Sequence, residues 1–108
     1  MEFVDLITVE QTFSIRQREL VLLPDFAVPD AWVDGVYTVF VVKPDAGRLQ
    51  AEATLTTAHF NIRDPHASIE KRWRVTISLK DLLKDDVPIG SGILIDMKIA
   101  NMLKNEAR

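Results

Sequence analysis

The two histidines, His59 and His66, are the residues whose type points most directly to metal binding or acid–base chemistry. Asp64 lies between them and Ser68 follows, so the segment holds the residue types of a metal site and of a hydrolase triad. A metal site needs three or four converging ligands, and a triad needs members held on separate rigid elements. These residues instead crowd around one Asp64-Pro65 turn. We therefore interpret both histidines as surface residues near a strand end, and predict no metal site.

Two other segments contain residues that some enzymes use. Gly90-Ser91-Gly92 has the small residues of a phosphate-binding loop, but an apolar run follows it instead of a clear helix start. Asp85 and Asp86 are adjacent, so their side chains point apart in what reads as a solvated loop. No Gly-x4-Gly-Lys-Ser/Thr motif is present. We predict a turn at Gly90–Gly92, no catalytic residue, no enzymatic activity, and neither cofactor nor nucleotide.

Basic residues form the best candidate for a binding surface. Arg72, Arg74 and Lys80 alternate onto one face of an expected strand, with Arg16 and Arg18 as candidate neighbours. One hypothesis is a cationic patch for RNA or an acidic protein. The other is a solvated strand face whose charges pair with Glu52, Glu10 or Glu70. Trp32 lies in a loop that either contacts a partner or covers a barrel mouth, which completes the candidate binding residues: Arg16, Arg18, Arg72, Arg74 and Trp32.

Composition limits the classes of protein. With 108 residues, 47% of them hydrophobic, we expect one domain over residues 1–108. The net charge of −3 disfavours a protein that mainly neutralises phosphates. The absence of cysteine excludes disulfides and thiolate metal sites. The N-terminal residues lack the basic start of a signal peptide and no apolar run approaches a membrane span, so we expect a cytoplasmic protein without membrane contact.

The elements that must position these residues have the two-residue period of β-strands. Residues 72–80 predict a strand with Trp73, Val75, Ile77 and Leu79 buried and with Arg72, Arg74, Thr76 and Ser78 exposed. Residues 7–15 alternate similarly through Ile7, Val9, Phe13 and Ile15. Residues 20–23 and 36–42 are apolar on both faces and are expected to be central strands. In residues 48–62 the apolar phase changes, which predicts a β-bulge near Thr56 and Thr57.

Turn residues connect these runs. Pro44-Asp45-Ala46-Gly47 predicts a hairpin between residues 36–42 and 48–55, with Gly47 free to take a positive φ. The C-terminal residues fit either a strand through Met97 and Ile99 or a helix face; we expect a strand to about Ile99, then a short helical turn. Short strands at this spacing predict an all-β fold, a small antiparallel β-barrel or sandwich.

Two segments give this chain a resemblance to the second domain of translation GTPases of the elongation factor Tu type, a β-barrel. The first, Phe13-Ser14-Ile15-Arg16-Gln17-Arg18-Glu19-Leu20-Val21-Leu22, is similar to that family's Phe-x-Ile strand, Gly-Arg-Gly turn and Val-rich strand. Gln17 and Glu19 replace both glycines, so the turn must take another shape. The second is Asp86-Val87-Pro88-Ile89-Gly90, before the last strand. The resemblance covers residues 10 to 95 and implies a stand-alone, domain-2-like binding barrel without the GTPase domain.

Three functional hypotheses remain open from the sequence. The leading one is a non-enzymatic protein-binding module that uses an edge strand or its basic face. The alternative implied by the resemblance is a translation-factor-like domain that contacts RNA or the ribosome, which the local arginines favour and the acidic balance opposes. A small immunity-like or antitoxin-like protein that neutralises a partner also fits the size and charge. The fold alone does not choose among these partners.

Overall fold

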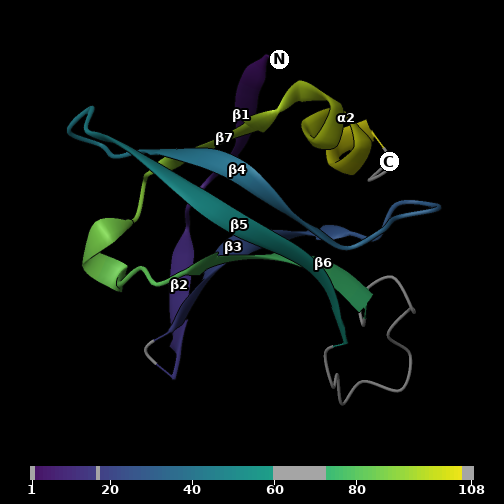
Figure 1. The fold of residues 1–108 in the computed structure, drawn as a ribbon, viewed down its shortest axis with the longest axis horizontal. Helices are drawn as coiled ribbons and strands as arrows, with labels where there is room; N and C mark the ends of the chain where they lie inside the picture. The colour runs from purple at the N-terminus through teal and green to yellow at the C-terminus, as the bar shows by residue number, and fades with distance from the viewer. Residues whose placement is uncertain (1, 17, 60–72, 106–108) are drawn as a thin grey trace.

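The computed structural model describes residues 2–16, 18–59 and 73–105. Most of these residues belong to one antiparallel sheet, and a 3-10 turn, η1, and a C-terminal helix, α2, complete the described fold (Figure 1). The elements are β1 (Phe3–Thr8), β2 (Gln11–Ile15), β3 (Glu19–Ala27), β4 (Gly35–Val42), β5 (Arg48–His59), β6 (Trp73–Lys80), η1 (Lys84–Asp86), β7 (Gly92–Asp96) and α2 (Met97–Asn105). The predicted all-β, barrel-like class is confirmed.

The sheet is curled, and two consecutive strands, β1 and β2, occupy its opposite edges. Its order is β1-β7-β4-β5-β6-β3-β2, so the chain passes from one edge to the other between β1 and β2. At this corner Val9 donates its N–H to the carbonyl of Ser91 (2.8 Å), and the carbonyl of Val9 accepts the N–H of Gly90 (2.8 Å). Glu10 donates its N–H to the carbonyl of Leu23 on β3 (2.9 Å). Two adjacent residues thus connect the two edges and close one corner of the barrel.

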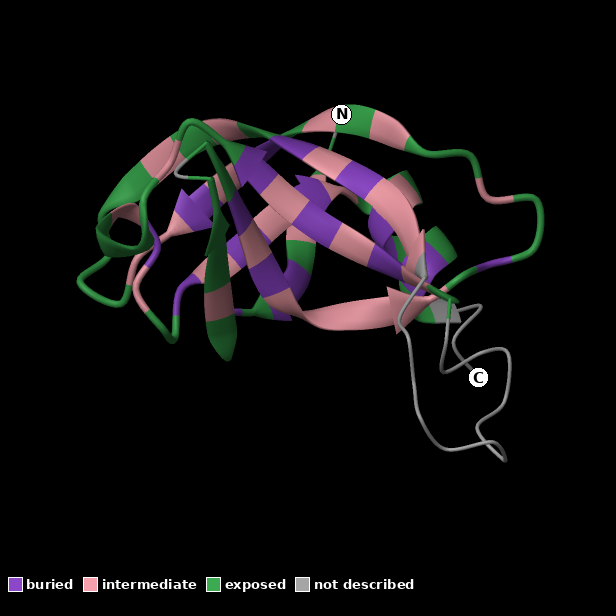
Figure 2. Ribbon diagram, turned by 90° about the horizontal axis from the view of Figure 1, so that it is seen from below, coloured by how far each residue is buried: buried purple, intermediate pink, exposed green. Residues whose placement is uncertain are grey.

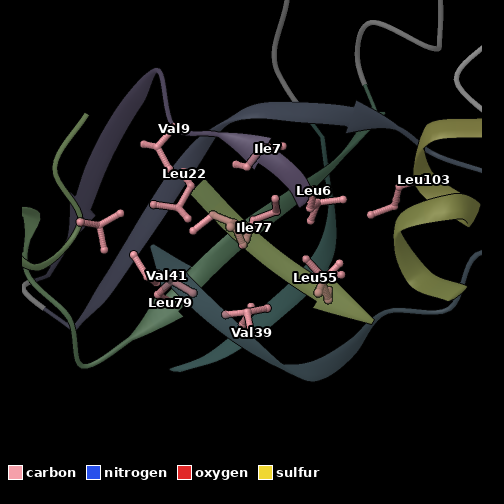
Figure 3. Close-up of a cluster of buried hydrophobic side chains, with 14 of the residues drawn as sticks. Leu6, Ile7, Val9, Leu22, Val39, Val41, Leu55, Ile77, Leu79 and Leu103 are labelled. Atoms are coloured by element: carbon pink, nitrogen blue, oxygen red, sulfur yellow. The ribbon is translucent and has the colours of Figure 1, made fainter. Parts of the chain in front are cut away.

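The core lies on the concave side of this curled sheet. Buried residues alternate with half-buried ones along the central strands (Figure 2). Side chains from opposite parts of the sheet meet inside, and Leu103 of α2 joins them (Figure 3). The fully buried large side chains are Val9, Leu20, Leu22, Val39, Val41, Leu55, Val75, Ile77, Leu79, Ile93, Ile95 and Leu103.

Strand β6 confirms most of the predicted alternation. Val75, Ile77 and Leu79 are fully buried. The prediction for Trp73 is wrong: it is 45% exposed, because it lies at the first position of β6, beyond the end of the core. The outward-facing residues of β6, Arg74, Thr76 and Ser78, are half-buried, whereas the sequence predicted them to be largely exposed. Strands β3 and β5 flank β6 on both sides, and their side chains cover that face. Arg72 lies outside the described residues.

Strands β4 and β5 form the predicted hairpin, pairing without interruption from Val42–Arg48 to Gly35–Leu55. The turn differs in one detail. Ala46, not Gly47, takes the positive φ, at 74°. The Asp45 carboxylate accepts the N–H of Gly47 at 2.8 Å, a side-chain bond that stabilises the turn. The predicted β-bulge at Thr56 and Thr57 is wrong, because β5 pairs in unbroken register with β6 through His59.

The irregularities occur in other strands. One register shift lies in β1 between Asp5 and Ile7, and another lies in β3 between Leu22 and Phe26, where the Leu23–Pro24 peptide bond is cis. Strands β3 and β4 each pair with a strand on both sides, as expected of central strands, and β3 is next to the edge strand β2. Phe60 and Ile62, which motivated the predicted bulge in β5, lie outside the described residues.

The C-terminal helical segment is present but begins earlier than expected. Strand β7 ends at Asp96, and residues 97–105 are helical. The Asp96 carboxylate accepts the N–H of Lys98 at 2.8 Å, which caps the helix N-terminus. Helical geometry then turns Ala100 and Leu103 into the core. In an extended strand Ala100 and Leu103 would point to opposite faces, whereas in the helix both face the core.

Candidate functional site

The candidate arginines do not form one patch in the described structure. Arg74 pairs with Ala27 at one end of the β3–β6 ladder, and Lys80 pairs with Glu19 at the other. Six residues of extended chain separate them, a distance of about 20 Å. Arg16 and Arg18 lie at the Glu19 end, in the turn between β2 and β3. The structure therefore groups Arg16 and Arg18 with Lys80 and places Arg74 elsewhere, while Arg72 lies outside the described residues.

Arg74 is held by a carboxylate. Its Nη2 lies 3.0 Å from Oδ1 of Asp25, and its Nε donates to the same oxygen at 3.1 Å. Both side chains are largely covered, with 27% and 22% of their surfaces exposed. The partner is Asp25 in the irregular part of β3, and not one of the glutamates considered from the sequence. This ion pair joins β6 to β3. The negative charge of Asp25 offsets the positive charge of Arg74, so the pair has little attraction for an anionic partner.

Trp32 is also held in place by its own loop. Its indole Nε1 donates to Oδ1 of Asp34 at 2.9 Å, and its ring packs against the core. The same Asp34 oxygen accepts the backbone N–H and the hydroxyl of Thr57 on β5, at 2.9 Å and 3.0 Å. Removal from water acts to raise the pKa of Asp34, but these hydrogen bonds from Thr57 and Trp32 hold it below its ordinary value. Trp32 and Asp34 together fasten the loop between β3 and β4 to β5.

The turn between β2 and β3 presents the remaining candidate arginines. Arg16 and Arg18 are exposed, and neither has an ion pair within the part of the chain that the structure describes. Arg16 has a φ of 51°, and Arg18 donates its N–H to the carbonyl of Ile15 at 3.0 Å. An open hollow at this turn is lined by Ile15, Arg16, Arg18 and Glu19.

Two apolar side chains stand next to these arginines. Phe13 is 50% exposed and Ile15 is 46% exposed, so the expectation that they continue the buried face of Ile7 and Val9 is wrong. Phe13 lies opposite Val21 on β3, whose neighbours Leu20 and Leu22 point into the core. Phe13 and Ile15 are therefore on the outer face of the sheet. We call Phe13, Ile15, Arg16 and Arg18 the β2 surface.

Sequence reasoning missed the apolar half of this surface. The alternation of residues 7–15 is the same on both sides of Val9, so the pattern does not show that the chain crosses between sheet edges there. One usable signal was Leu20–Leu23, which is apolar on both faces. An apolar outer face on β3 is continued by an apolar outer residue on the neighbouring strand, and Phe13 of β2 is that residue.

Of the other residues considered for chemistry, Asp86 and Ser91 hold turns, Asp85 is exposed, and His59 is the last residue of β5. Oδ2 of Asp86 accepts the N–H of Leu83 at 2.8 Å. Ser91 is buried and donates its hydroxyl to the carbonyl of Pro88 at 2.6 Å, within the turn before β7. Asp64, His66 and Ser68 are outside the described residues. Among residues 2–16, 18–59 and 73–105, no three metal-ligating side chains gather.

The described residues also contain no helix that is long and apolar enough to span a membrane. No family model, curated protein or solved structure matches this chain. The resemblance to the second domain of translation GTPases therefore stays a prediction.

Proposed function

We propose that this chain is a non-enzymatic protein-binding module whose contact region is the β2 surface. The observation that carries the proposal is an edge strand with Phe13 and Ile15 about half exposed, beside two arginines without ion pairs in the described structure. Aromatic side chains and arginine are the types enriched where proteins bind one another.

The two edges of the sheet differ in a way that supports this assignment. Helix α2 packs beside β1, where Lys104 donates to the carbonyl of Asp5 and Met97 donates its N–H to the carbonyl of Glu2. An edge covered in this way is protected from pairing with another chain. Strand β2 pairs with β3 on one side. The short turn η1 packs beside β2, but no described strand pairs with the other side of β2. Edge strands of this kind are common places for a partner to bind.

Binding to RNA or the ribosome is the second candidate, and the exposed arginines Arg16 and Arg18 favour it. Two observations weigh against it: Arg74 is paired with Asp25, and about 20 Å separates it from the other cations. A net charge of −3 also lowers the general attraction for phosphates. The protein-binding proposal uses both the apolar and the basic halves of the surface, whereas RNA attraction uses only the basic half.

The test is capture of partners from nuclease-treated extract of the source cells on the immobilised chain. The wild type, Phe13→Asp and a matched control, Val33→Asp, are compared; Val33 is 75% exposed but lies in the loop between β3 and β4. We expect a discrete protein to be retained by the wild type and the control and lost with Phe13→Asp. Retention unaffected by Phe13→Asp would assign binding to another surface.

A second arm tests the RNA alternative with purified components. Fluorescent RNA is titrated with wild type and with the double variant Arg16→Glu, Arg18→Glu at several salt concentrations. We expect negligible binding at physiological salt. Micromolar, salt-sensitive binding that the double variant loses would replace the proposed function with the RNA-binding one.

A further inference from the structure

We propose that the partner on the β2 surface is a second copy of this chain, with the two β2 strands paired antiparallel about a two-fold axis. This inference rests on the proposed function, because it names the partner of that same surface. Phe13 would lie opposite Phe13 of the second copy, and Glu10 would lie near the turn that carries Arg16 of the second copy. The sheets of the two copies would then join through their β2 edges.

The length of β2 selects this register. The strand runs from Gln11 to Ile15, so Phe13 is its middle residue. Antiparallel pairing about Phe13 places Gln11 opposite Ile15 and Thr12 opposite Ser14, and all five residues are paired. A shift of two residues leaves only three paired, because the chain turns away after Ile15, where Arg18 donates its N–H to the Ile15 carbonyl.

The charges that flank β2 are complementary in the same register. Glu10 precedes the strand and Arg16 follows it, and both are exposed. Neither has an ion pair among the described residues. Two-fold symmetry would bring Glu10 of each copy next to the turn that carries Arg16 of the other copy, and so create two equivalent contacts of opposite charge. Opposite charges across an antiparallel pair are stabilising, and like charges are destabilising.

The apolar side chains gain a continuous cover in this arrangement. Phe13 and Ile15 lie on the outer face, next to half-buried Val21. Pairing about Phe13 brings two phenylalanines together, with an Ile15 on each side. Cross-strand aromatic pairs are favourable, and burying them removes apolar surface from water. The contact is short, so we expect a dimer with micromolar affinity.

The test is sedimentation equilibrium of the purified chain over a range of concentrations. We expect a concentration-dependent dimer for the wild type and for Val33→Asp, and a monomer for Phe13→Asp. Glu10→Arg alone and Arg16→Glu alone should each weaken the dimer about tenfold, because each brings like charges next to one another twice. The double variant Glu10→Arg, Arg16→Glu should restore the wild-type affinity to within about threefold. Circular dichroism shows that each variant is folded.

The outcomes separate this inference from the proposed function. A folded wild type that stays monomeric at high concentration overturns the inference, and capture of a different protein through Phe13 would still support the function. A dimer that Phe13→Asp does not weaken overturns the inference too. A dimer that depends on Phe13 but is not restored by the charge exchange overturns the proposed register. A monomer together with no partner in extract overturns both proposals.

Discussion

Individual polar residues in this protein mostly hold one part of the chain to another. Asp34 shows this clearly, because a single carboxylate oxygen accepts hydrogen bonds from Trp32, on its own loop, and from the backbone and hydroxyl of Thr57, on β5. Asp45, Asp86 and Asp96 each accept one backbone N–H within two or three residues. Carboxylates used in this way stabilise turns and helix ends.

Replacing Asp34 by alanine should destabilise the protein by about 0.5 to 1 kcal/mol at pH 7, since the site is exposed and its hydrogen bonds compete with water. Asp34→Asn keeps an acceptor oxygen and should cost less. The pKa of Asp34 is lower in the folded chain, so its contribution is present above the ordinary value of 3.8 and is lost as pH falls through the folded pKa. Urea unfolding at pH 7 and at pH 3 should show the difference between wild type and Asp34→Ala shrinking at low pH.

Strands and their pairings are the next scale, and an ion pair there spans the irregular part of the β3–β6 ladder. If the register of Glu19–Leu22 continued, Asp25 would lie directly opposite Arg74 of β6. The shift places Ala27 opposite Arg74 instead, and the Asp25 and Arg74 side chains still make an ion pair of 3.0 Å. The residues are far apart in sequence and lie in an irregular part of the ladder.

The Arg74–Asp25 pair should show measurable coupling. We expect Arg74→Ala and Asp25→Ala each to destabilise the fold, and the double variant to cost less than their sum by about 0.5 to 1 kcal/mol. A double-mutant cycle by chemical denaturation measures this coupling. The coupling should decrease at high salt, and additive effects of the two substitutions would mean that the contact contributes nothing.

Ile77 lies at the centre of β6 and is fully buried. Ile77→Ala should cost about 2 to 5 kcal/mol, because it removes packed methyl groups and leaves a cavity. Val36→Ala is the matched control, since Val36 is an exposed strand residue on β4 and should change stability by less than about 0.5 kcal/mol. Denaturation midpoints of the two variants measure both values, and equal midpoints would contradict the assignment of Ile77 to the core.

At the scale of the whole molecule, the chain passes from one sheet edge to the other at Val9 and Glu10, and the two edges have different properties. The chain leaves β1, whose edge α2 covers, and enters β2, whose outer residues remain exposed. The core is built from apolar side chains of the curled sheet, of α2 and of the connecting segments, among them Val9 and Val87. Fold and binding surface are therefore built from different faces of the same strands.

Such a core predicts stability that does not depend on a metal or a nucleotide. We expect EDTA, GTP, ATP and Mg²⁺ each to leave the Tm unchanged, because a ligand that binds the folded state raises the Tm and removal of a bound metal lowers it. Differential scanning calorimetry of untagged protein checks this, with elemental analysis for a tightly held metal. A stoichiometric metal, or a nucleotide-dependent rise in Tm, would contradict the binding-module proposal.

Local sequence patterns predicted most strands and the β4–β5 hairpin, but not which apolar residues stay exposed. Ile7 and Phe13 belong to the same alternating segment, and only Ile7 is buried. The difference arises at Val9 and Glu10, where contacts with Ser91 and Leu23 move the chain to the other sheet edge. Those contacts join residues distant in sequence, so the alternation could not reveal them.

What the sequence determined by itself was the class of fold, the positions of most turns and the inward residues of β6 after Trp73. These depend on side-chain alternation and turn chemistry, which act over a few residues. The tertiary structure decided the rest: the separation of Arg74 from Arg16 and Arg18, the exposure of Phe13 and Ile15, and the early start of α2. Exposure depends on what covers a side chain, and the covering residues here come from strands and a helix far along the chain.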